Sequence, residues 1–496
     1  MDDGQRSEAA VGLLHTGVEA DDTFKVEEHG INQIPDTDRH GNPRELFWVW
    51  FGANVIFTWV ISGSIIVGFG LTFWQALAVV LIGNLFYILL GLGGLAGPKA
   101  GTATLAVSRS AFGNLGNAPA ALLSWITVVG WEAVNIVIGT FALYQLALLV
   151  HVPGGGATKA VCLAIVTVVT FAVALWGHAT IVFMAKVFSY ALGIGTVVLA
   201  LYVLPKAHIA HPVGQVGSAS LGIWLLAFAL IAAGPLSWVN YPADYTRYFP
   251  RTASGKAITW WTVLGSAIPT IFICMIGVVA ATATNMSDPV GGLQKLVPTW
   301  FFSVYLAVIV GGTITNNFLN TYSSGMSLLA TGIRLSRVRS ILIDAVIGTL
   351  MSIYAVFVFD FTNSFIEFLS LMLIWIVPWC AIYLVDMAMR RNSYDGHALH
   401  TRGGGAYWYD RGWNWRAIFA FALGILGAGA FANAPLWTGP LVRLVDHGDA
   451  SIFAGFILAG GSYYLLMRGR IGQPAPAVVV PEAIEATTTA GAVDGS

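Results

Sequence analysis

The sequence Gly234-Pro235-Leu236-Ser237-Trp238 interrupts an apolar run that covers residues 221–246. Pro235 has no N–H to donate, so it leaves a backbone carbonyl without its helical partner. In hydrocarbon such a carbonyl is tolerated only where it is buried in protein or faces a cavity. A second break is expected in the first apolar run, 47–68, where β-branched and small polar residues surround Gly63. Two broken helices at matching places of two halves indicate a transporter's binding site, although two simple kinks would give the same pattern.

The composition around these breaks is that of an integral membrane protein. Of the 496 residues, 56% are hydrophobic and 10% are charged, whereas about a quarter of a soluble protein is charged. A net charge of -1 also excludes the basic surface that nucleic-acid binding requires. Runs of about 20 apolar residues can cross a bilayer. They predict an all-α fold with twelve transmembrane spans, at 47–68, 73–96, 117–145, 159–177, 181–205, 221–246, 258–283, 297–322, 338–359, 364–388, 416–437 and 449–467.

Lysine and arginine indicate the orientation in the membrane. They are concentrated before span 1 and after spans 2, 6, 8, 10 and 12, and positive residues are retained in the cytoplasm. We therefore expect a plasma-membrane protein with both termini cytoplasmic. Residues 1–46 lack the apolar core of a cleaved signal, so the first span is expected to direct insertion. The predicted parts are an N-terminal tail (1–46), spans 1–5 (47–205), spans 6–10 (221–388), a cytoplasmic loop (389–415), spans 11 and 12 (416–467) and a C-terminal tail (468–496).

Span 3 places Trp131, Glu132 and Asn135 near the middle of the membrane. Residues i and i+4 share a helix face, so Trp131 and Asn135 are expected to project together, with Glu132 one step round the helix. A carboxyl at this depth is too costly to face lipid and is expected to point inward, paired or protonated. A structural carboxyl that is hydrogen-bonded to a neighbouring helix is the alternative.

Span 8 is unusually polar for a transmembrane helix. Between residues 313 and 325 most side chains carry a hydroxyl or an amide. Such side chains must line a wet cavity or join helices, and we favour the cavity. The candidates for contact with a ligand or an ion are Thr313, Thr315, Asn316, Asn317 and Asn320.

These residue types suit binding of a planar nitrogen heterocycle. An indole face stacks on a flat ring, and amide side chains pair with the ring's donors and acceptors; Trp131 or Trp238 and the span-8 asparagines supply both. The sequence shows no catalytic Ser-His-Asp set, phosphate-binding loop or metal-ligand cluster, so we expect no cofactor and no enzymatic activity. A membrane-embedded enzyme, a channel, and an amino-acid carrier of similar fold remain alternatives.

Motifs along residues 47–430 resemble those of the nucleobase:cation symporters, the family of cytosine-purine, uracil, allantoin and hydantoin permeases. The motif around Asp244 resembles the purine-cytosine branch most. The residues that carry the resemblance are Trp50-Phe51-Gly52-Ala53-Asn54, Gly97-Pro98-Lys99-Ala100-Gly101, Ser108-Arg109-Ser110-Ala111-Phe112-Gly113, Gly130-Trp131-Glu132 with Asn135, Ser237-Trp238, Ala243-Asp244-Tyr245-Thr246-Arg247-Tyr248, the polar span 8, Val377-Pro378-Trp379 to Asp386, and Ala406-Tyr407-Trp408-Tyr409 to Gly412-Trp413-Asn414-Trp415.

The resemblance implies a core of two inverted five-helix repeats, spans 1–5 and 6–10, with spans 1 and 6 broken and two peripheral spans, working by alternating access. It implies that the substrate is a nucleobase or a related planar heterocycle such as a ureide or a vitamin. It also implies that the stacking tryptophan is Trp131. The other substrate-binding residues that it implies are Asn135, Gly234, Ser237, Trp238 and Asn320 or its neighbour Asn317.

The resemblance also implies coupling to a cation, either a proton or Na⁺. A sodium site in this family would use span-1 carbonyls, here Phe57 and Val60, and span-8 groups among Thr313, Thr315 and Asn316. Ile314 stands where the family has a second hydroxyl, which weakens the case for sodium. Glu132 offers a buried carboxyl that an apolar bundle drives toward its protonated form, so we favour proton coupling.

Three charged residues lie at the predicted cytoplasmic ends of spans: Arg109, Asp244 and Arg247. We predict salt bridges or gate contacts for them and no contact with the substrate. Charges that only fix the topology are the alternative for the two arginines.

Overall fold

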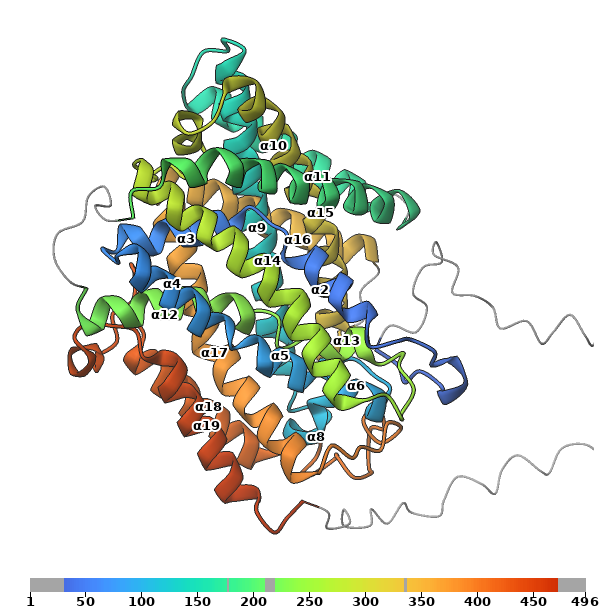
Figure 1. Ribbon diagram of the computed structural model, residues 1–496. Helices are drawn as coiled ribbons and strands as arrows, with labels where there is room; N and C mark the ends of the chain where they lie inside the picture. Colours follow the sequence, from blue (N-terminus) through green and yellow to red (C-terminus); the bar gives the residue numbers. More distant parts are fainter. Residues whose placement is uncertain (1–30, 176–177, 210–218, 334–336, 472–496) are drawn as a thin grey trace, which may run out of the picture.

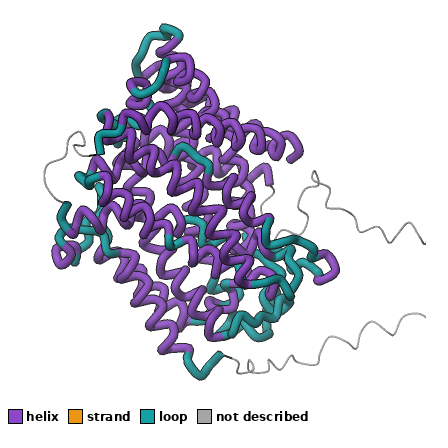
Figure 2. The backbone as a smooth tube through the Cα atoms, viewed as in Figure 1, coloured by secondary structure: helices purple, strands orange, loops and turns teal. Residues whose placement is uncertain are grey.

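The computed structural model describes residues 31–175, 178–209, 219–333 and 337–471, and this part of the chain is a bundle of helices (Figures 1 and 2). No strand forms within it; isolated β-bridges join Asp410 to Trp413 and Asn433 to Thr438. The prediction of an all-α fold is therefore confirmed for the described residues. Most of the predicted tails, 1–46 and 468–496, lies outside them.

Each predicted span corresponds to one or more helices. In chain order these are α2 (Glu45–Asn54) and α3 (Thr58–Gly68); α4 (Phe73–Asn84), α5 (Tyr87–Gly93) and α6 (Ala96–Ala100); α9 (Ala118–Leu149); α10 (Gly156–Leu175); α11 (His178–Val203); α12 (Leu221–Leu236) and α13 (Pro242–Thr246); α14 (Gly255–Ala283); α15 (Thr299–Thr331); α16 (Arg337–Ile353) with a π-helical turn, η4 (Tyr354–Val358); α17 (Phe361–Met389); α18 (Trp415–Phe431); and α19 (Ser451–Met467). The short helices η1 (Asp36–Asp38), α7 (Thr104–Val107), α8 (Arg109–Phe112), η2 (Leu204–Lys206), η3 (Gly291–Lys295) and η5 (Val442–Val445) lie between them.

Length and composition make the chain a multi-pass membrane protein. Within the described residues, 7 helical segments are long and apolar enough to cross a membrane, and the α2–α3 pair makes an eighth if it is counted as one bent span. Four further helices are apolar but shorter, at Gly156–Ala172, Leu221–Leu236, Trp415–Phe431 and Ser451–Met467. Two predicted ends are wrong. The helix α15 continues to Thr331, beyond residue 322, because its amides and hydroxyls lower the hydropathy without ending the helix. The helix α18 ends at Phe431, before the predicted residue 437.

The predicted break in the first span lies between α2 and α3, whose axes bend by 59°. Asn54 ends α2, and its side chain donates to the Trp50 carbonyl at 2.9 Å. Its Oδ1 accepts from the Tyr87 hydroxyl at 2.7 Å, so α5 holds the end of α2 in place. Residues 55–57 then lead to α3 outside any helix.

The predicted break in the sixth span follows Pro235. The helix α12 ends at Leu236, and the Ser237 hydroxyl donates to the Gly234 carbonyl at 2.7 Å. Because Pro235 has no N–H, the preceding turn lacks one helical hydrogen bond. Pro242, whose fixed φ suits the first turn of a helix, starts α13.

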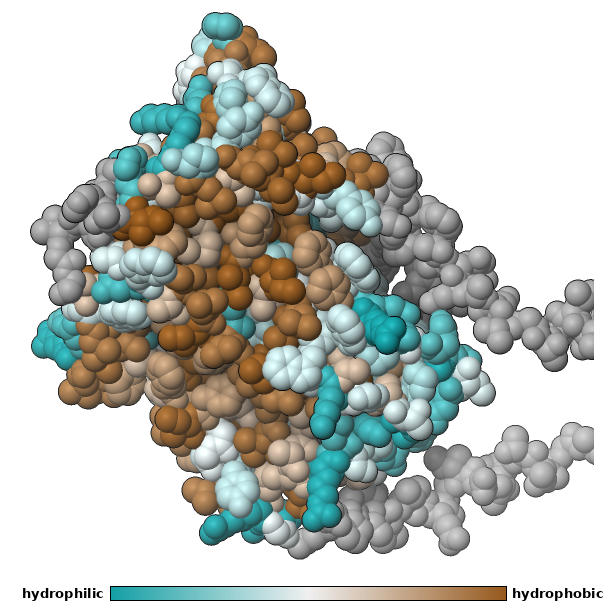
Figure 3. All heavy atoms as spheres, in the orientation of Figure 1, coloured by the Kyte–Doolittle hydropathy of each residue, from teal (hydrophilic) through white to brown (hydrophobic). Residues whose placement is uncertain are grey.

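The long helices α9 and α15 pack against each other through the centre of the bundle, while α3 packs on α14. Small residues permit the second contact: a Cβ at Gly277 would overlap the Val60 carbonyl, and one at Gly63 would overlap that of Cys274. At one edge α18 and α19 pack on α17 (Figure 1). Apolar side chains cover most of the visible face (Figure 3), as expected of a surface that meets lipid. The centres of α9 and α15 thus lie in the interior, beside the two breaks.

Candidate functional site

A pocket lies where the two breaks meet the middles of α9 and α15. Its empty volume is about 450 Å³, part of which is open to the surroundings. The pocket is lined by Ile56, Trp59, Val128, Trp131, Ser237, Trp238, Tyr241, Asn316, Asn320 and Ser323. Five of these, Trp131, Ser237, Trp238, Asn316 and Asn320, are among the residues proposed from the sequence, which are thereby brought together.

Three tryptophans contribute flat walls to this pocket. Rings of α17 hold the Trp131 indole in edge-to-face contacts, with ring centroids at 5.4 Å for Phe368 and 6.4 Å for Phe365. Trp238 lies in an edge-to-face contact with Trp50 at 5.6 Å. Trp59 is 3% exposed. A signal for Trp59 existed in the sequence, since it follows the first break directly, but nothing there distinguished it from a lipid-facing aromatic residue.

Gly234 lies beneath Trp59 and does not itself line the pocket. A Cβ at position 234 would overlap the Trp59 ring, and a rigid ring in a packed wall cannot move aside cheaply. We therefore expect Gly234→Ala to displace Trp59 and to lower substrate uptake by about tenfold or more, the effect of losing 1.4 kcal/mol. Uptake into cells, normalised to the amount of protein in the membrane, measures this effect.

Gly52→Ala is the matched control, because a Cβ on Gly52 of α2 would meet nothing within 4 Å. Its uptake should equal that of the wild type. Normal uptake by Gly234→Ala would show that the position of Trp59 does not matter for transport.

The polar residues of α15 fall on two faces. Asn316, Asn320 and Ser323 share one face at i, i+4 and i+7 and line the pocket. The neighbouring face points toward α9 and α16: the Asn317 amide donates to the Glu132 carbonyl at 3.1 Å, and the Thr321 hydroxyl donates to Glu132 Oε1 at 3.0 Å. The polarity of span 8 thus serves both the pocket and the contacts between helices.

Asn135 lies behind the pocket wall. Its Nδ2 donates to Asn316 Oδ1 and to Asn317 Oδ1, both at 2.9 Å, and Asn320 Nδ2 donates to the same Asn317 oxygen at 3.1 Å. These bonds fix the orientation of the two pocket amides, Asn316 and Asn320. Asn135 and Asn317 thus orient the amides that line the pocket.

Glu132 is 0% exposed and does not line the pocket. Its Oε1 accepts from Thr321, whereas its Oε2 is buried without any hydrogen-bond partner. A buried carboxylate with an unsatisfied oxygen is costly. The neutral acid is the form that this environment accommodates.

A hydroxyl cluster lies beside the pocket at the second break. The Tyr241 and Ser327 hydroxyls contact the Ser124 hydroxyl at 3.0 and 3.1 Å, and Asn240 Nδ2 donates to it at 2.6 Å. This cluster ties the segment between α12 and α13 to α9 and α15. Tyr241 also lines the pocket. The sequence analysis did not predict it, because the break expected at Pro235 was limited to residues 234–238.

The family model that describes permeases for cytosine/purines, uracil, thiamine and allantoin matches residues 33–455. The chain belongs to this family. It is therefore a permease and not an enzyme, as the motifs indicated.

Relatives of the permease extend over nearly its full length. It is 29% identical over 471 residues to the putative purine-cytosine permease YxlA of Bacillus subtilis, with 91% of this chain and 98% of that protein covered. It is 26% identical over 472 residues to the purine-cytosine permease fcyB of Emericella nidulans, with 89% and 88% covered. Over 333 residues, 62% of this chain and 56% of the relative, it is 27% identical to the vitamin B6 transporter TPN1 of Saccharomyces cerevisiae.

The fold of the permease is that of a solved transporter. A structure of Mhp1, described as a nucleobase-cation-symport-1 family transporter in a closed conformation with bromovinylhydantoin bound, matches with a TM-score of 0.69 at 20% identity, covering 89% of this chain and 95% of that one. The inward-facing conformation of Mhp1 matches with a TM-score of 0.70 at 18% identity, covering 91% and 96%. This likeness shows a common fold.

The residues considered for a sodium site face different neighbours in the permease. The Thr313 and Thr315 hydroxyls each donate at 3.0 Å to a carbonyl of their own helix. Thr313 lies against Gly139 of α9, while the Val60 carbonyl lies against Gly277 of α14. The Phe57 carbonyl accepts from the Val60 amide at 2.9 Å, and Asn316 lines the pocket.

No metal cluster accompanies these oxygens. Among the residues that the structure describes, no three His, Cys, Asp or Glu side chains come together as a metal site.

Of the three charged residues predicted at span ends, Arg109 and Arg247 are buried and Asp244 is partly buried. Asp244 accepts from the Thr104 amide and hydroxyl at 2.7 and 2.9 Å, which joins α13 to α7. The Arg109 guanidinium donates to the carbonyls of Ala330 at 3.3 Å and Leu399 at 3.2 Å. Arg247 is 1% exposed and lies over the Tyr248 ring at 5.1 Å. None of the three lines the pocket.

His400 of the loop after α17 completes this region. Its Nδ1 lies 3.3 Å from Arg109 Nη1, and its Nε2 lies 3.3 Å from the Thr102 hydroxyl. A neutral ring with its hydrogen on Nε2 fits both contacts, because the guanidinium can only donate. Burial, with the adjacent positive charge of Arg109, lowers the pKa of His400 to about 4.

This lowered pKa predicts a loss of stability in acid. Between about pH 6.5 and pH 4 the unfolded chain takes up a proton on His400 that the folded protein does not, so the free energy of unfolding falls as the pH falls. We expect the Tm in detergent to drop between about pH 7 and pH 5, and the drop to be smaller by a few degrees in His400→Gln. The exposed His208, replaced by glutamine, is the control and should behave as the wild type. Equal drops in wild type and His400→Gln would contradict the interpretation.

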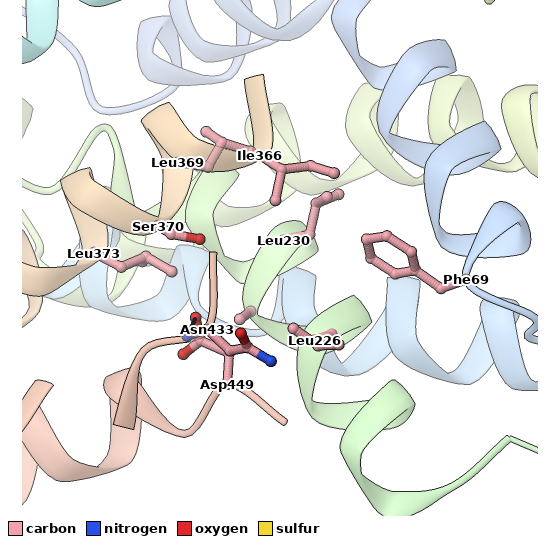
Figure 4. A pocket seen from close by; sticks show the side chains of 10 residues that line it. Phe69, Leu226, Leu230, Ile366, Leu369, Ser370, Leu373, Asn433 and Asp449 are labelled. Atoms are coloured by element: carbon pink, nitrogen blue, oxygen red, sulfur yellow. Dashed lines mark hydrogen bonds between the residues drawn. The ribbon is translucent and has the colours of Figure 1, made fainter. Parts of the chain in front are cut away.

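A second pocket differs in character (Figure 4). It lies between α12, α17 and the segment that joins α18 to α19, and its empty volume is about 280 Å³. Leucine, isoleucine, alanine and phenylalanine side chains dominate it, with Ser370, Asn433 and Asp449 as the polar members. Asp449 Oδ2 accepts a hydrogen bond from the backbone N–H of Asn433, and its Oδ1 accepts one from the backbone N–H of Ser451. With these oxygens engaged and no tryptophan wall, this pocket suits a flat heterocycle less well.

Proposed function

We propose that the chain carries a nucleobase or a related planar nitrogen heterocycle by alternating access, and that it binds this substrate between Trp59, Trp131 and Trp238. The single observation that carries the proposal is the position of the pocket, beside two broken helices at the centre of the bundle, where the Asn316 and Asn320 amides meet indole faces. Asn316 and Asn320 would pair with the donors and acceptors of the ring. Asn135, Asn317, Gly234 and Ser237 would hold those groups in place.

The proposal includes the predicted architecture. Twelve spans would form two inverted repeats, 47–205 and 221–388, followed by a cytoplasmic loop at 389–415 and the peripheral spans at 416–467. The matching breaks at α2–α3 and α12–α13, and the packing of α3 on α14 and of α9 on α15, support this division. The Lys and Arg bias supports cytoplasmic tails (1–46 and 468–496) in the plasma membrane. Arg109, Asp244 and Arg247 would then brace the cytoplasmic side.

A proton is the coupling ion that we propose, with Glu132 as its carrier. The unpartnered Oε2 of Glu132 favours a protonated carboxyl. The Thr313 and Thr315 hydroxyls are directed to their own helix and the Val60 carbonyl to α14, which gives less support to sodium. If uptake depended on sodium at constant pH, Na⁺ would be the coupling ion. Its candidate ligands would then be Phe57, Val60, Thr313, Thr315 and Asn316.

Counterflow in proteoliposomes tests the function itself. Vesicles that contain the purified chain are preloaded with unlabelled base, and the uptake of the labelled base is followed. Preloading should accelerate uptake through a carrier, whereas a channel would show no such acceleration. Cytosine, adenine, hypoxanthine, uracil, allantoin, thiamine and pyridoxine form the panel, with an amino-acid mixture as the negative arm. Acceleration by amino acids alone would reject the proposal, and acceleration by pyridoxine alone would assign a vitamin carrier.

A further inference from the structure

The face of α15 that turns away from the pocket joins two buried carboxyl groups. Thr321 donates to Glu132 of α9 at 3.0 Å. Ser324, three residues further on the same side of the helix, donates to Asp344 Oδ2 of α16 at 2.6 Å. Glu132 and Asp344 are both 0% exposed. The proposed function so far uses only the first of them.

Asp344 occupies a site that suits a charged carboxylate. Its second oxygen, Oδ1, accepts from the Trp125 indole N–H at 2.9 Å. Both oxygens therefore accept a hydrogen bond, and a carboxylate is the form that only accepts. Two donors of this kind offset part of the cost of a charge in the bundle.

Glu132 lies next to Asp344, and its free oxygen points toward the helix of Asp344. A Cβ built on Gly348 of α16 would lie 3.9 Å from Glu132 Oε2, and Gly348 is one turn after Asp344 on the same face of that helix. Oε2 has no hydrogen-bond partner. The two carboxyls thus lie on one interface, about one helical turn or 5 Å apart along the helix axis.

No positive charge balances the pair. Within the described residues neither carboxyl forms an ion pair. The Lys159 ammonium lies over the Tyr144 ring at 5.3 Å, at the far end of α9, and Asp386 pairs with Arg390 at 2.8 Å. The other ionisable side chains that the structure describes on the surrounding helices are Tyr305 and Tyr322 on α15, Cys162 on α10, the exposed Arg339 on α16, Tyr354 on η4, and Glu367, Cys380 and Tyr383 on α17.

We propose that Asp344 is a second proton-binding group of this permease and that it exchanges the coupling proton with Glu132. The inference rests on the proposed function, in which Glu132 carries that proton. In the transfer the O–H bond of the Glu132 acid breaks and an O–H bond forms on Asp344. One negative charge moves from Asp344 to Glu132, and the net charge of the pair stays at minus one. The Thr321 hydroxyl donates to one of the two carboxyls and the Ser324 hydroxyl to the other.

The direction of the path follows from the helix ends. Asp344 lies one turn nearer than Glu132 to the start of α16 and to the start of α9, where Trp125 is located. Both helices begin on the side that the Lys and Arg bias assigns to the cytoplasm. Asp344 is therefore placed to pass the proton between Glu132 and the cytoplasmic side.

The test compares two activities of Asp344→Asn in proteoliposomes, with cytosine and hypoxanthine as probes. Counterflow at equal pH on both sides reports binding and conformational exchange. Accumulation driven by an acidic outside solution, with a pH dye trapped inside, reports proton coupling. Asparagine retains the shape of aspartate and can accept from Trp125, so the fold should persist. Asp449→Asn, a buried acid held between α18 and α19, is the matched control.

We expect Asp344→Asn to keep counterflow within about twofold of the wild type and to lose about tenfold or more of its proton-driven accumulation. Asp449→Asn should retain both activities. Accumulation by Asp344→Asn within about twofold of the wild type would overturn the inference. Loss of both activities in Asp344→Asn would assign it a structural role and would also overturn it. If the wild type itself shows no counterflow with any base, the proposed function fails instead, so the two failures are distinct.

Ser324→Ala decides the matter if Asp344→Asn does not fold. This variant keeps the Asp344 carboxyl but removes one donor to it, which favours the protonated form. The pH dependence of accumulation should then shift toward higher pH, while counterflow at equal pH is retained. A purely structural Ser324 would leave the pH profile unchanged, and an unchanged profile would overturn the inference.

Discussion

Trp131→Ala should weaken the binding of the transported base by about tenfold or more, because stacking a base on an aromatic ring contributes about 1–3 kcal/mol. The structure strengthens this expectation. Phe365 and Phe368 hold the indole edge-on, so the ring is oriented before the base arrives and little entropy is lost on binding. Trp131→Phe keeps a flat ring and should lose less affinity. The dissociation constant from a thermal-shift titration and the KM of counterflow measure both variants.

Trp260→Ala is the control for the loss of an indole. Trp260 lies on α14 and is 57% exposed, on a surface that would meet lipid. Its replacement should leave the affinity for the base unchanged, even if it lowers the Tm. Wild-type affinity in Trp131→Ala would exclude this indole as the stacking surface and would leave Trp59 and Trp238 as the candidates.

The sequence was sufficient for the breaks because their causes are local. Pro235 lacks a donor wherever the helix is placed. In the first span the β-branched Val55 and Ile56 lie at the break, whereas Gly63, around which unwinding was expected, lies inside α3 and packs on α14. The family motifs, which are also local, identified the permease correctly. The end of α15 was wrong because hydropathy measures transfer to lipid, whereas Ser323, Ser324 and Ser327 are buried against other helices.

The roles of individual amides could not be predicted in the same way. Both Asn316 and Asn317 are polar, so the usual contrast between an apolar and a polar face does not fix the rotation of α15. The side chains of adjacent helical residues point in directions about 100° apart. Asn316 therefore lines the pocket, whereas Asn317 bonds to α9. Two partners of Asn317 lie more than a hundred positions away, at Asn135 and Glu132, and only packing brings them together.

Glu132→Gln should abolish proton-driven accumulation and preserve counterflow. Glutamine has nearly the shape of glutamic acid and can still accept a hydrogen bond from Thr321. It has no carboxyl group to bind the coupling proton, so uptake can no longer be driven by the proton gradient. Accumulation should fall about tenfold or more, to the level of simple equilibration, while counterflow stays within about twofold. The two assays in proteoliposomes give both numbers on one preparation. Normal accumulation by Glu132→Gln would end the role of this carboxyl in coupling.

Gly348→Ser tests the same site without removing the carboxyl. A Cβ at position 348 would lie 3.9 Å from Glu132 Oε2, so a serine hydroxyl can reach hydrogen-bonding distance of that free oxygen. A new donor stabilises the charged form of Glu132, and accumulation should then require a more acidic outside solution than in the wild type. Gly348→Ala, which adds the Cβ without the hydroxyl, controls for packing and should keep the wild-type pH profile. If serine and alanine behave alike, Oε2 does not carry the coupling proton, because a group that binds the transported proton must respond to a donor placed beside it.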